Sequence, residues 1–222
     1  MTTRVSLIAL TGLMAGLFHV LSGPDHLAAV APLAVEDGRR GWLAGWTWGF
    51  GHASGVVVVA LLAIVLRNLL PSVDVLSAWG ERVVGVALIG IGLWALRRAL
   101  NISPGAHHHG AVEHDHMHVH SGPDWARQIG HAHASFCMGI LHGVAGSSHF
   151  LGVLPALALP TRAAAISYIA AFGVGTVAAM TAFAAIIGSA GIRIHHRAAL
   201  HRGMLLAAAT LAIAVGGYWL VS

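Results

Sequence analysis

Six long stretches of mostly apolar residues constrain the fold of this chain more than any other feature of its sequence. They cover residues 5–35, 41–66, 75–98, 135–159, 163–190 and 198–221. Each is longer than the roughly 20 residues that a helix needs to cross the hydrocarbon core of a bilayer. A backbone in lipid must satisfy its own hydrogen bonds, which a helix does within one segment. We therefore expect an all-α integral membrane protein with six transmembrane helices.

The composition agrees with this class and excludes several others. Of the 222 residues, 57% are hydrophobic and 9% are charged, whereas a soluble domain carries about 25% charged residues. The single Cys137 rules out an intrachain disulfide and a metal site built from several thiolates. The first stretch is too long for a removable signal peptide. No length remains for a soluble catalytic domain, and the positive charge indicates membrane topology rather than nucleic-acid binding.

Two of the stretches have nearly the same sequence. One reads GLFHVLSGPDHLAAVAPLA from Gly16, and the other reads GILHGVAGSSHFLGVLPAL from Gly139. The ungapped alignment matches Gly16/Gly139, His19/His142, Gly23/Gly146, His26/His149, Val30/Val153 and Pro32/Pro155. After a gap of one residue, Phe50-Gly51 aligns with Phe172-Gly173, and Ser54 falls opposite Thr176.

This repeat divides the chain into two halves. We expect a first three-helix repeat over residues 1–100, a His-rich loop over 101–134 and a second three-helix repeat over 135–222. Three spans are an odd number, so the halves cross the bilayer in opposite directions. Inverted repeats with interrupted helices that meet near the midplane are a recurrent plan of transporters. The expected fold is two inverted three-helix repeats in which the first helix of each is interrupted.

The arginines predict the orientation of the chain, which contains no lysine. Positive residues accumulate in cytoplasmic loops. Eight arginines lie in the loops after the first, third and fifth stretches, and four lie on the opposite side: Arg39, Arg40, Arg97, Arg98, Arg127, Arg193, Arg197 and Arg202 against Arg4, Arg67, Arg82 and Arg162. This places both termini outside the cytoplasmic (inner) membrane and the His-rich loop in the cytoplasm. An interfacial tryptophan belt is expected at Trp42, Trp46 and Trp48.

The first copy of the repeat contains a group of polar side chains that could bind a cation. An unbroken helix would hold His19 and His26 about 10 Å apart along its axis. Pro24 cannot donate a backbone hydrogen bond and Gly23 weakens the same turn, so a break here can bring the two histidines and Asp25 to one point. Asp25 alone among the eight acidic residues lies well inside a stretch. A carboxylate at that depth must be paired, protonated or bound to a cation.

Imidazole and carboxylate ligands suit Ni²⁺, Co²⁺, Zn²⁺ or Cu²⁺. His52 adds a third imidazole in the second stretch, and the second copy of the repeat adds two more. Because serines replace Pro24 and Asp25 in that copy, we expect the first half to hold the main site and the second half a gate or a weaker site. The predicted metal ligands are His19, Asp25, His26, His52, His142 and His149, with helix breaks at Gly23, Pro24 and Gly146.

Three short sequences, HVLSGPDH, WGFGHASG and HGVAGSSH, resemble the nickel/cobalt transporter superfamily. The similarity is strongest to its small six-span members, which are related to urease-accessory and hydrogenase-accessory nickel permeases. The resemblance implies that Ni²⁺ or Co²⁺ is a transported substrate and not a prosthetic group. It also implies that His19, Asp25, His26 and His52 fall on metal-selective positions. The best-known nickel importers have eight spans and another spacing in the first motif, so the direction of transport stays open, as does a homo-oligomer or a metallochaperone partner.

The loop 101–134 holds nine of the 17 histidines. It has no apolar periodicity, and we expect it to be largely disordered. Histidine-rich tracts bind divalent metals loosely, and the family's exporters often carry such a segment, which favours efflux. Auxiliary metal binding is predicted at His107, His108, His109, His114, His116, His118 and His120.

Other functions fit the sequence less well than metal transport. A pump driven by its own ATP site is excluded because the chain has no lysine and therefore no GxxxxGK motif. An intramembrane serine protease is disfavoured because the serine before His149 lacks the flanking glycine of a nucleophile turn. A di-iron oxidase would need histidine boxes at the ends of ordered spans. We expect a transporter and not an enzyme; the alternative is a proton-coupled transporter of another solute, with His19 and Asp25 as proton relay groups.

Overall fold

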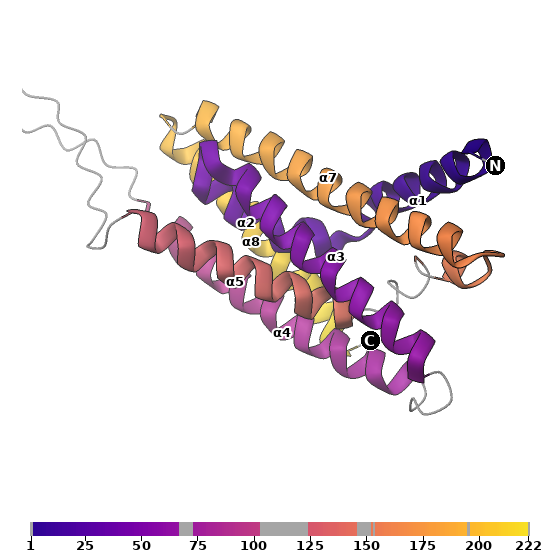
Figure 1. The fold of residues 1–222 in the computed structure, drawn as a ribbon. Coiled ribbons are helices and arrows are strands. Elements are labelled where there is room, and N and C mark those ends of the chain that lie inside the picture. Colours follow the sequence, from indigo (N-terminus) through magenta and orange to yellow (C-terminus); the bar gives the residue numbers. More distant parts are fainter. Residues whose placement is uncertain are drawn as a thin grey trace, which may run out of the picture.

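The computed structural model describes residues 2–66, 73–102, 124–145, 152, 154–194 and 196–221. These residues form helices and connecting turns, and none of them lies in a strand. The helices are α1 (Thr2–Ser22), α2 (Pro24–Asp37), the 3₁₀ turn η1 (Gly38–Arg40), α3 (Gly41–Leu66), α4 (Val73–Leu100), α5 (Asp124–Ala145), α7 (Arg162–Ile194) and α8 (Ala198–Val221) (Figure 1). The expectation of an all-α protein is therefore confirmed for the described part of the chain.

Three of the described helices are long and apolar enough to cross a membrane. They cover Trp79–Leu100, Arg162–Ile194 and Ala198–Val221. A fourth candidate is a broken one, in which Ser6–Ser22 and Pro24–Ala60 meet at an angle of 73°. The number of candidate spans is therefore three to four, and the six predicted from the sequence are confirmed only in part.

The break between α1 and α2 lies where Gly23 and Pro24 predict it. Gly23 is extended, with φ −91° and ψ 100°, and Pro24 opens α2. A residue before proline disfavours the helical region, and proline is well tolerated in the first turn of a helix. The first apolar stretch therefore folds as two helices rather than one. The corresponding break predicted at Gly146 lies outside the described residues.

One boundary differs from the sequence prediction. Helix α5 begins at Asp124, so residues 124–134, which we expected in a disordered loop, are helical. Pro123 directly precedes this helix in the sequence, and an acidic residue in the first turn interacts favourably with the positive end of the helix dipole. Both features are signals for the start of a helix, and a search for apolar residues alone does not detect them.

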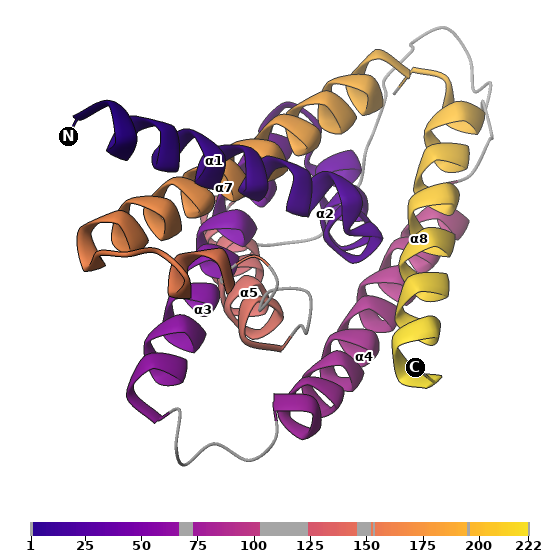
Figure 2. The same cartoon turned by 90° about the vertical axis from the view of Figure 1, so that its right-hand side faces the viewer.

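Three helix pairs have the most extensive contacts, α1 with α7, α3 with α5 and α4 with α8, and α3 also packs along α7. In Figure 2 the α4–α8 pair runs along one side of the molecule, apart from the crossing of α1 over α7. Small residues permit this closeness. A Cβ atom on Gly85 would lie 2.8 Å from the carbonyl oxygen of Gly216, and one on Gly216 would lie 2.6 Å from that of Gly85.

The two halves of the chain make equivalent contacts with each other: the contact of α1 with α7 matches the contact of α5 with α3. A Cβ on Gly16 of α1 would collide with the carbonyl of Phe172 and lie 2.9 Å from the amide nitrogen of Thr176. A Cβ on Gly139 of α5 would collide with the carbonyl of Trp48 and lie 3.0 Å from the amide nitrogen of His52. The pair α1–α7 is thus repeated by the pair α5–α3.

A second set of contacts follows the same exchange. A Cβ on Gly175 of α7 would collide with the carbonyl of Leu13, and one on Gly51 of α3 would collide with that of Phe136. Phe136 is the partner of Leu13 in the same ungapped alignment that matches His19 with His142. The contacts make His52 equivalent to Thr176, whereas the sequence alignment had placed Ser54 there. That alignment was wrong by two residues, because helices rich in Gly and Ala align almost equally well in neighbouring registers.

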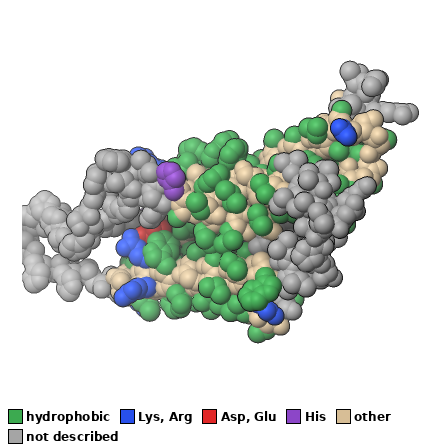
Figure 3. Space-filling model, turned by 60° about the horizontal axis from the view of Figure 1, so that its bottom comes forward, with side chains coloured by type: hydrophobic (Ala, Val, Ile, Leu, Met, Phe, Trp, Pro, Cys, Tyr) green, Lys and Arg blue, Asp and Glu red, His purple; other side chains and the backbone are tan. Residues whose placement is uncertain are grey.

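The surface suits an apolar environment. Large side chains such as Phe18, Ile166 and Ile186 are each more than 60% exposed. Figure 3 shows one face on which hydrophobic side chains dominate the middle, while Arg side chains lie toward its ends. At one end, Arg98 of α4 donates a hydrogen bond of 2.7 Å from Nε to Glu36 of α2. Such a distribution is compatible with a membrane protein.

The close approach of α5 to α3 can be tested with Gly139→Ala. Its Cβ has no free space beside Trp48 and His52, and overpacking of this kind costs about 1–3 kcal/mol. We expect a lower melting temperature in detergent. The matched control is Gly90→Ala in α4, where a Cβ meets nothing within 4 Å and alanine favours the helix by up to about 1 kcal/mol. Equal melting temperatures for the two variants would contradict this packing.

Candidate metal centre

The break after Ser22 turns the chain so that both histidines of the first motif meet. His19 lies in the last turn of α1, and His26 lies in the first turn of α2. Their ring centroids are 4.6 Å apart, less than half of the separation of about 10 Å along an unbroken helix. The local sequence, with Gly23 and Pro24 between them, therefore brings together two side chains that a continuous helix would separate.

Gly23 is in close contact with the side chains of this turn. A Cβ on it would collide with Nδ1 of His26 and would lie 2.8 Å from Oδ1 of Asp25. The absence of a side chain at this position leaves room for both groups. Gly23 is needed here for space, since its backbone conformation is open to other residues.

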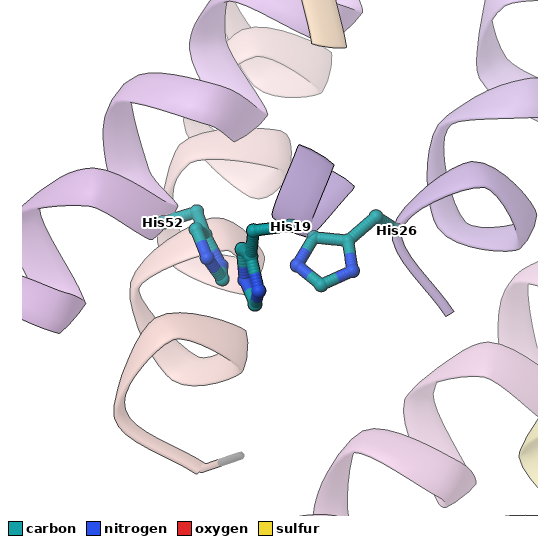
Figure 4. Close-up of side chains that lie close together, drawn as sticks. All are labelled: His19, His26 and His52. Atoms are coloured by element: carbon teal, nitrogen blue, oxygen red, sulfur yellow. The ribbon is translucent and has the colours of Figure 1, made fainter. Parts of the chain in front are cut away.

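His52 of α3 completes a group of three imidazoles. Its side chain is fully buried, and its ring stacks on that of His19 with centroids 5.6 Å apart. Its centroid lies 4.9 Å from that of His26. Figure 4 shows the three side chains converging from three different helices. One nitrogen from each of these rings lies within 4.8 Å of the other two, close enough for a shared metal ion.

Asp25 connects the first half of the chain to the second. Its Oδ1 lies 3.0 Å from Nδ1 of His26, and its Oδ2 lies 2.9 Å from Nε2 of His142 in α5. The residue is 2% exposed, and within the described part of the chain it is the one buried carboxylate. An ionised carboxylate in such a place needs a positive partner, which a protonated histidine or a bound cation can supply.

Asp25, His26 and His142 form a second group whose ligand atoms lie within 4.8 Å of one another. All three residues are buried. The rings of His26 and His142 have centroids 4.7 Å apart. The five residues together, His19, Asp25, His26, His52 and His142, are called the His/Asp cluster below.

Glycines of α5 and two aromatic side chains surround the cluster. A Cβ on Gly143 would collide with the carbonyl oxygen of His52, so the lack of a side chain here lets α5 approach α3. Trp48 lies 6.2 Å from His142 between ring centroids, and Phe172 lies 5.5 Å from His19. Both aromatic residues are almost fully buried. These apolar surroundings strengthen the electrostatic interactions of the cluster, because they exclude water.

The structure gathers five of the six predicted intramembrane ligands. Four of them, His19, Asp25, His26 and His52, come from the first half, as the motifs indicated. His142 lies 2.9 Å from Asp25 and so does not belong to a separate, weaker site, while the alternative expectation of a gate in the second half stays a prediction. His149 and Gly146 lie outside the described residues. So do all seven predicted auxiliary ligands of the loop, from His107 to His120.

The role of one tryptophan also differs from the prediction. Trp42 and Trp46 are 45% and 48% exposed, as an interfacial belt requires, but Trp48 is 1% exposed and faces the cluster. The side chain lies on the side of α3 that α5 covers. Sequence reasoning missed Trp48 and Phe172 as neighbours of the cluster because neither has a polar motif around it.

Comparisons with known proteins add an independent line of information. The chain is 40% identical over 187 residues to chloroplast protein FOR GROWTH AND FERTILITY 1 of Arabidopsis thaliana, and 38% identical over 188 residues to protein 2 of the same name. These alignments cover 82% and 84% of this chain but 49% and 48% of the plant proteins. The chain therefore spans about half the length of these two relatives.

A bacterial relative matches over most of both sequences. The chain is 30% identical over 195 residues to the urease accessory protein UreH of Bacillus sp. strain TB-90, which covers 83% of this chain and 80% of that protein. No protein-family profile matches the chain, and neither does any solved structure. The chain belongs to the family of the urease accessory protein UreH.

Proposed function

We propose that this protein is a secondary transporter of a divalent transition metal ion, nickel or cobalt, across the cytoplasmic membrane. The observation that carries the proposal is the His/Asp cluster. It assembles four imidazoles and one carboxylate from α1, α2, α3 and α5 at a buried place between apolar helices. Ionisable groups in such surroundings are costly and usually mark an ion pathway.

The chemistry of the ligands narrows the cargo. Imidazole nitrogen suits nickel, cobalt, zinc and copper(II), and the described part of the cluster includes no thiolate, which disfavours copper(I). The relative named as a urease accessory protein supports nickel, as does the resemblance of the motifs to the nickel/cobalt transporter superfamily. The names of the plant relatives refer to growth and fertility and leave the cargo open.

The proposed architecture is six transmembrane helices in two inverted three-helix repeats. The exchanged contacts of α1–α7 and α5–α3 support it, because a two-fold relation between halves of opposite orientation produces such pairs. The arginines of the loops support an orientation with both termini outside and the His-rich loop in the cytoplasm. A cluster at the junction of two such repeats would be accessible in turn from either side.

A pocket of about 70 Å³ lies between the end of α2, the start of α3 and α5, on the proposed cytoplasmic side of the molecule. It is lined by Asp37, Arg40, Leu43, Ala44, Thr47, Ala132 and Ser135. Ser135 precedes His142 by seven residues, so the pocket lies about 10 Å from the cluster along α5. Thr47, which lines the pocket, directly precedes Trp48, and the Trp48 ring lies 6.2 Å from that of His142 between centroids.

The alternative proposal is a proton-coupled transporter of another solute. The position of Asp25 between His26 and His142, at 3.0 Å and 2.9 Å, favours it, since a carboxylate between two imidazoles can pass a proton. This alternative predicts solute movement without metal binding at the cluster. Metal flux and metal binding therefore distinguish the two proposals.

The transport proposal is tested by reconstituting the protein in liposomes and following the flux of Ni²⁺, Co²⁺ and Zn²⁺. Asp25→Ala removes the buried charge and His19→Ala removes one imidazole, and we expect each to reduce metal flux at least about tenfold, by analogy with the loss of affinity at disturbed metal sites. The matched control is His133→Ala, an exposed histidine of α5 outside the cluster. Absence of metal flux in the unaltered protein, or flux untouched by either cluster variant, would overturn the proposal.

The helix break is tested with Gly23→Ala, which keeps every ligand of the cluster. Because the new Cβ collides with the His26 ring, we expect His26 and Asp25 to move and the affinity for Ni²⁺ to fall about tenfold or more. Isothermal titration calorimetry in detergent measures this, with Gly90→Ala as the control. Unchanged affinity would show that the geometry at Gly23 is unimportant for binding.

The auxiliary role of the His-rich loop is tested by replacing its seven predicted ligands, His107 to His120, with asparagine. We propose that the loop collects or buffers ions at the cytoplasmic face. The variant should then change the concentration dependence of transport and retain its maximal flux. Complete loss of flux would contradict an auxiliary role.

A further inference from the structure

The five ligands of the His/Asp cluster form two groups of three that share one residue. The imidazole triad consists of His19, His26 and His52, and the carboxylate triad consists of Asp25, His26 and His142. In each triad one ligand atom per residue lies within 4.8 Å of the others. The described residues thus present two overlapping coordination positions instead of one position with five ligands.

The distances explain why one ion cannot use both triads fully at the same time. Metal–nitrogen bonds are about 2.0–2.1 Å long, so two ligand atoms on the same ion are at most about 4.2 Å apart. Among the described residues, the ligand atoms fall within 4.8 Å of one another only in these two groups of three, although the His52 ring is as near to that of His142, with centroids 5.4 Å apart, as to that of His19, at 5.6 Å. An ion at the centre of one triad would therefore be too far away to bind the ligands that belong only to the other triad.

His26 can serve both positions because imidazole has two nitrogen atoms on different edges of its ring. Its Nδ1 faces Asp25, 3.0 Å from Oδ1. In Figure 4 one ring nitrogen of His26 faces His19, and the other lies on the far side of the ring from His19. We therefore assign the nitrogen that faces His19 to the imidazole triad and Nδ1, which lies beside Asp25, to the carboxylate triad.

The two positions differ in charge more than in burial. The imidazole triad is composed of neutral ligands when its rings are unprotonated, while the carboxylate triad includes the negative charge of Asp25. Asp25, His26 and His142 are all at most 2% exposed, but His19 is only half-buried. His52 is fully buried as well, so the two positions differ mainly in charge, and the carboxylate triad has the stronger attraction for a cation.

The positions also connect different helices. An ion in the imidazole triad connects α1, α2 and α3, all from the first half of the chain. An ion in the carboxylate triad connects α2 to α5, and so joins the two halves through Asp25 and His142. The location of the ion therefore determines which helices it holds together.

We propose that the cluster is a two-position relay, in which one metal ion moves between the imidazole triad and the carboxylate triad by exchanging ligands around His26. This inference rests on the proposed function, since it presumes that the cluster binds the transported ion. Ligands are exchanged one at a time: Asp25 and His142 replace His19 and His52, the ion passes from the His26 nitrogen that faces His19 to Nδ1, and the ring proton moves from Nδ1 to the vacated nitrogen. Such a stepwise exchange avoids a bare ion in an apolar environment, which would be strongly unfavourable.

The relay is tested by Co²⁺ binding to the purified full-length chain in detergent, with the seven loop histidines replaced by asparagine to remove background binding. Visible absorption of Co²⁺ and X-ray absorption spectroscopy report the stoichiometry and the nitrogen and oxygen ligands. His52→Ala and His142→Ala each disable one triad, and His26→Ala disables both. His133→Ala is the control on α5, and asparagine variants at the same three positions replace any alanine variant that fails to fold.

We expect His52→Ala and His142→Ala each to retain one Co²⁺ per chain, with different spectra. His52→Ala should show carboxylate oxygen among its ligands, and His142→Ala should show an environment richer in nitrogen. His26→Ala should bind at least about tenfold more weakly than either. In liposomes both single-triad variants should lose most of their Co²⁺ flux although they bind the ion, because a relay needs both positions.

Two results would overturn the inference in different ways. Equal loss of binding in all three variants, with identical residual spectra, would indicate one composite site and refute the relay, while the proposed metal transport would stand. No Co²⁺ bound by the cluster of the protein that lacks only the loop histidines would refute the proposed function and the relay together.

Discussion

The arrangement of the helices depends on a carboxylate that has been removed from water. Burial of an ion costs roughly several kcal/mol even after the protein relaxes around it. Only close partners of opposite charge or hydrogen-bonding groups offset this cost. Asp25 has such partners on both oxygens, with His26 at 3.0 Å and His142 at 2.9 Å. Since one partner comes from its own helix and the other from α5, this interaction connects the two halves of the chain at their centre.

Several features of the packing bring Asp25 and its two partners within hydrogen-bond distance. The extended Gly23 and the following Pro24 end one helix and begin another, which points Asp25 and His26 back toward His19. Gly139 and Gly143 let α5 approach α3 closely enough for His142 to reach the carboxylate. A larger residue at either glycine would separate the helices and leave the carboxylate with one partner fewer.

The exchanged contacts explain how a chain of this size can build a central site. Each half supplies a helix that packs on the second helix of the other half, so that α1–α7 and α5–α3 repeat the same geometry. The equivalence is incomplete in its chemistry: the position of His52 is taken by Thr176 in the second half, and that of Asp25 by a serine. The polar groups of the described cluster are consequently concentrated in the first half, and the second half contributes His142.

Local sequence was sufficient for much of this picture. The apolar stretches at 41–66, 75–98, 163–190 and 198–221 predicted helices of nearly the right extent, and the Gly-Pro pair predicted the break, because both are properties of a few neighbouring residues. The histidines and Asp25 could be identified as candidates for the same reason. The start of α5 at Asp124 was missed, since its first turns are polar and lack the apolar pattern on which the prediction relied.

The sequence by itself determined the helical class of the described part of the protein, the place of the break and the candidate ligands of the first motif. Tertiary structure alone decided that His142 joins those ligands, that Trp48 faces the cluster instead of an interface, and that the second helices of the two halves are equivalent in a register two residues away from the one aligned. These features depend on which faces of separate helices meet. Close contact between glycines and backbone carbonyls sets that choice, and no spacing within a single segment encodes it.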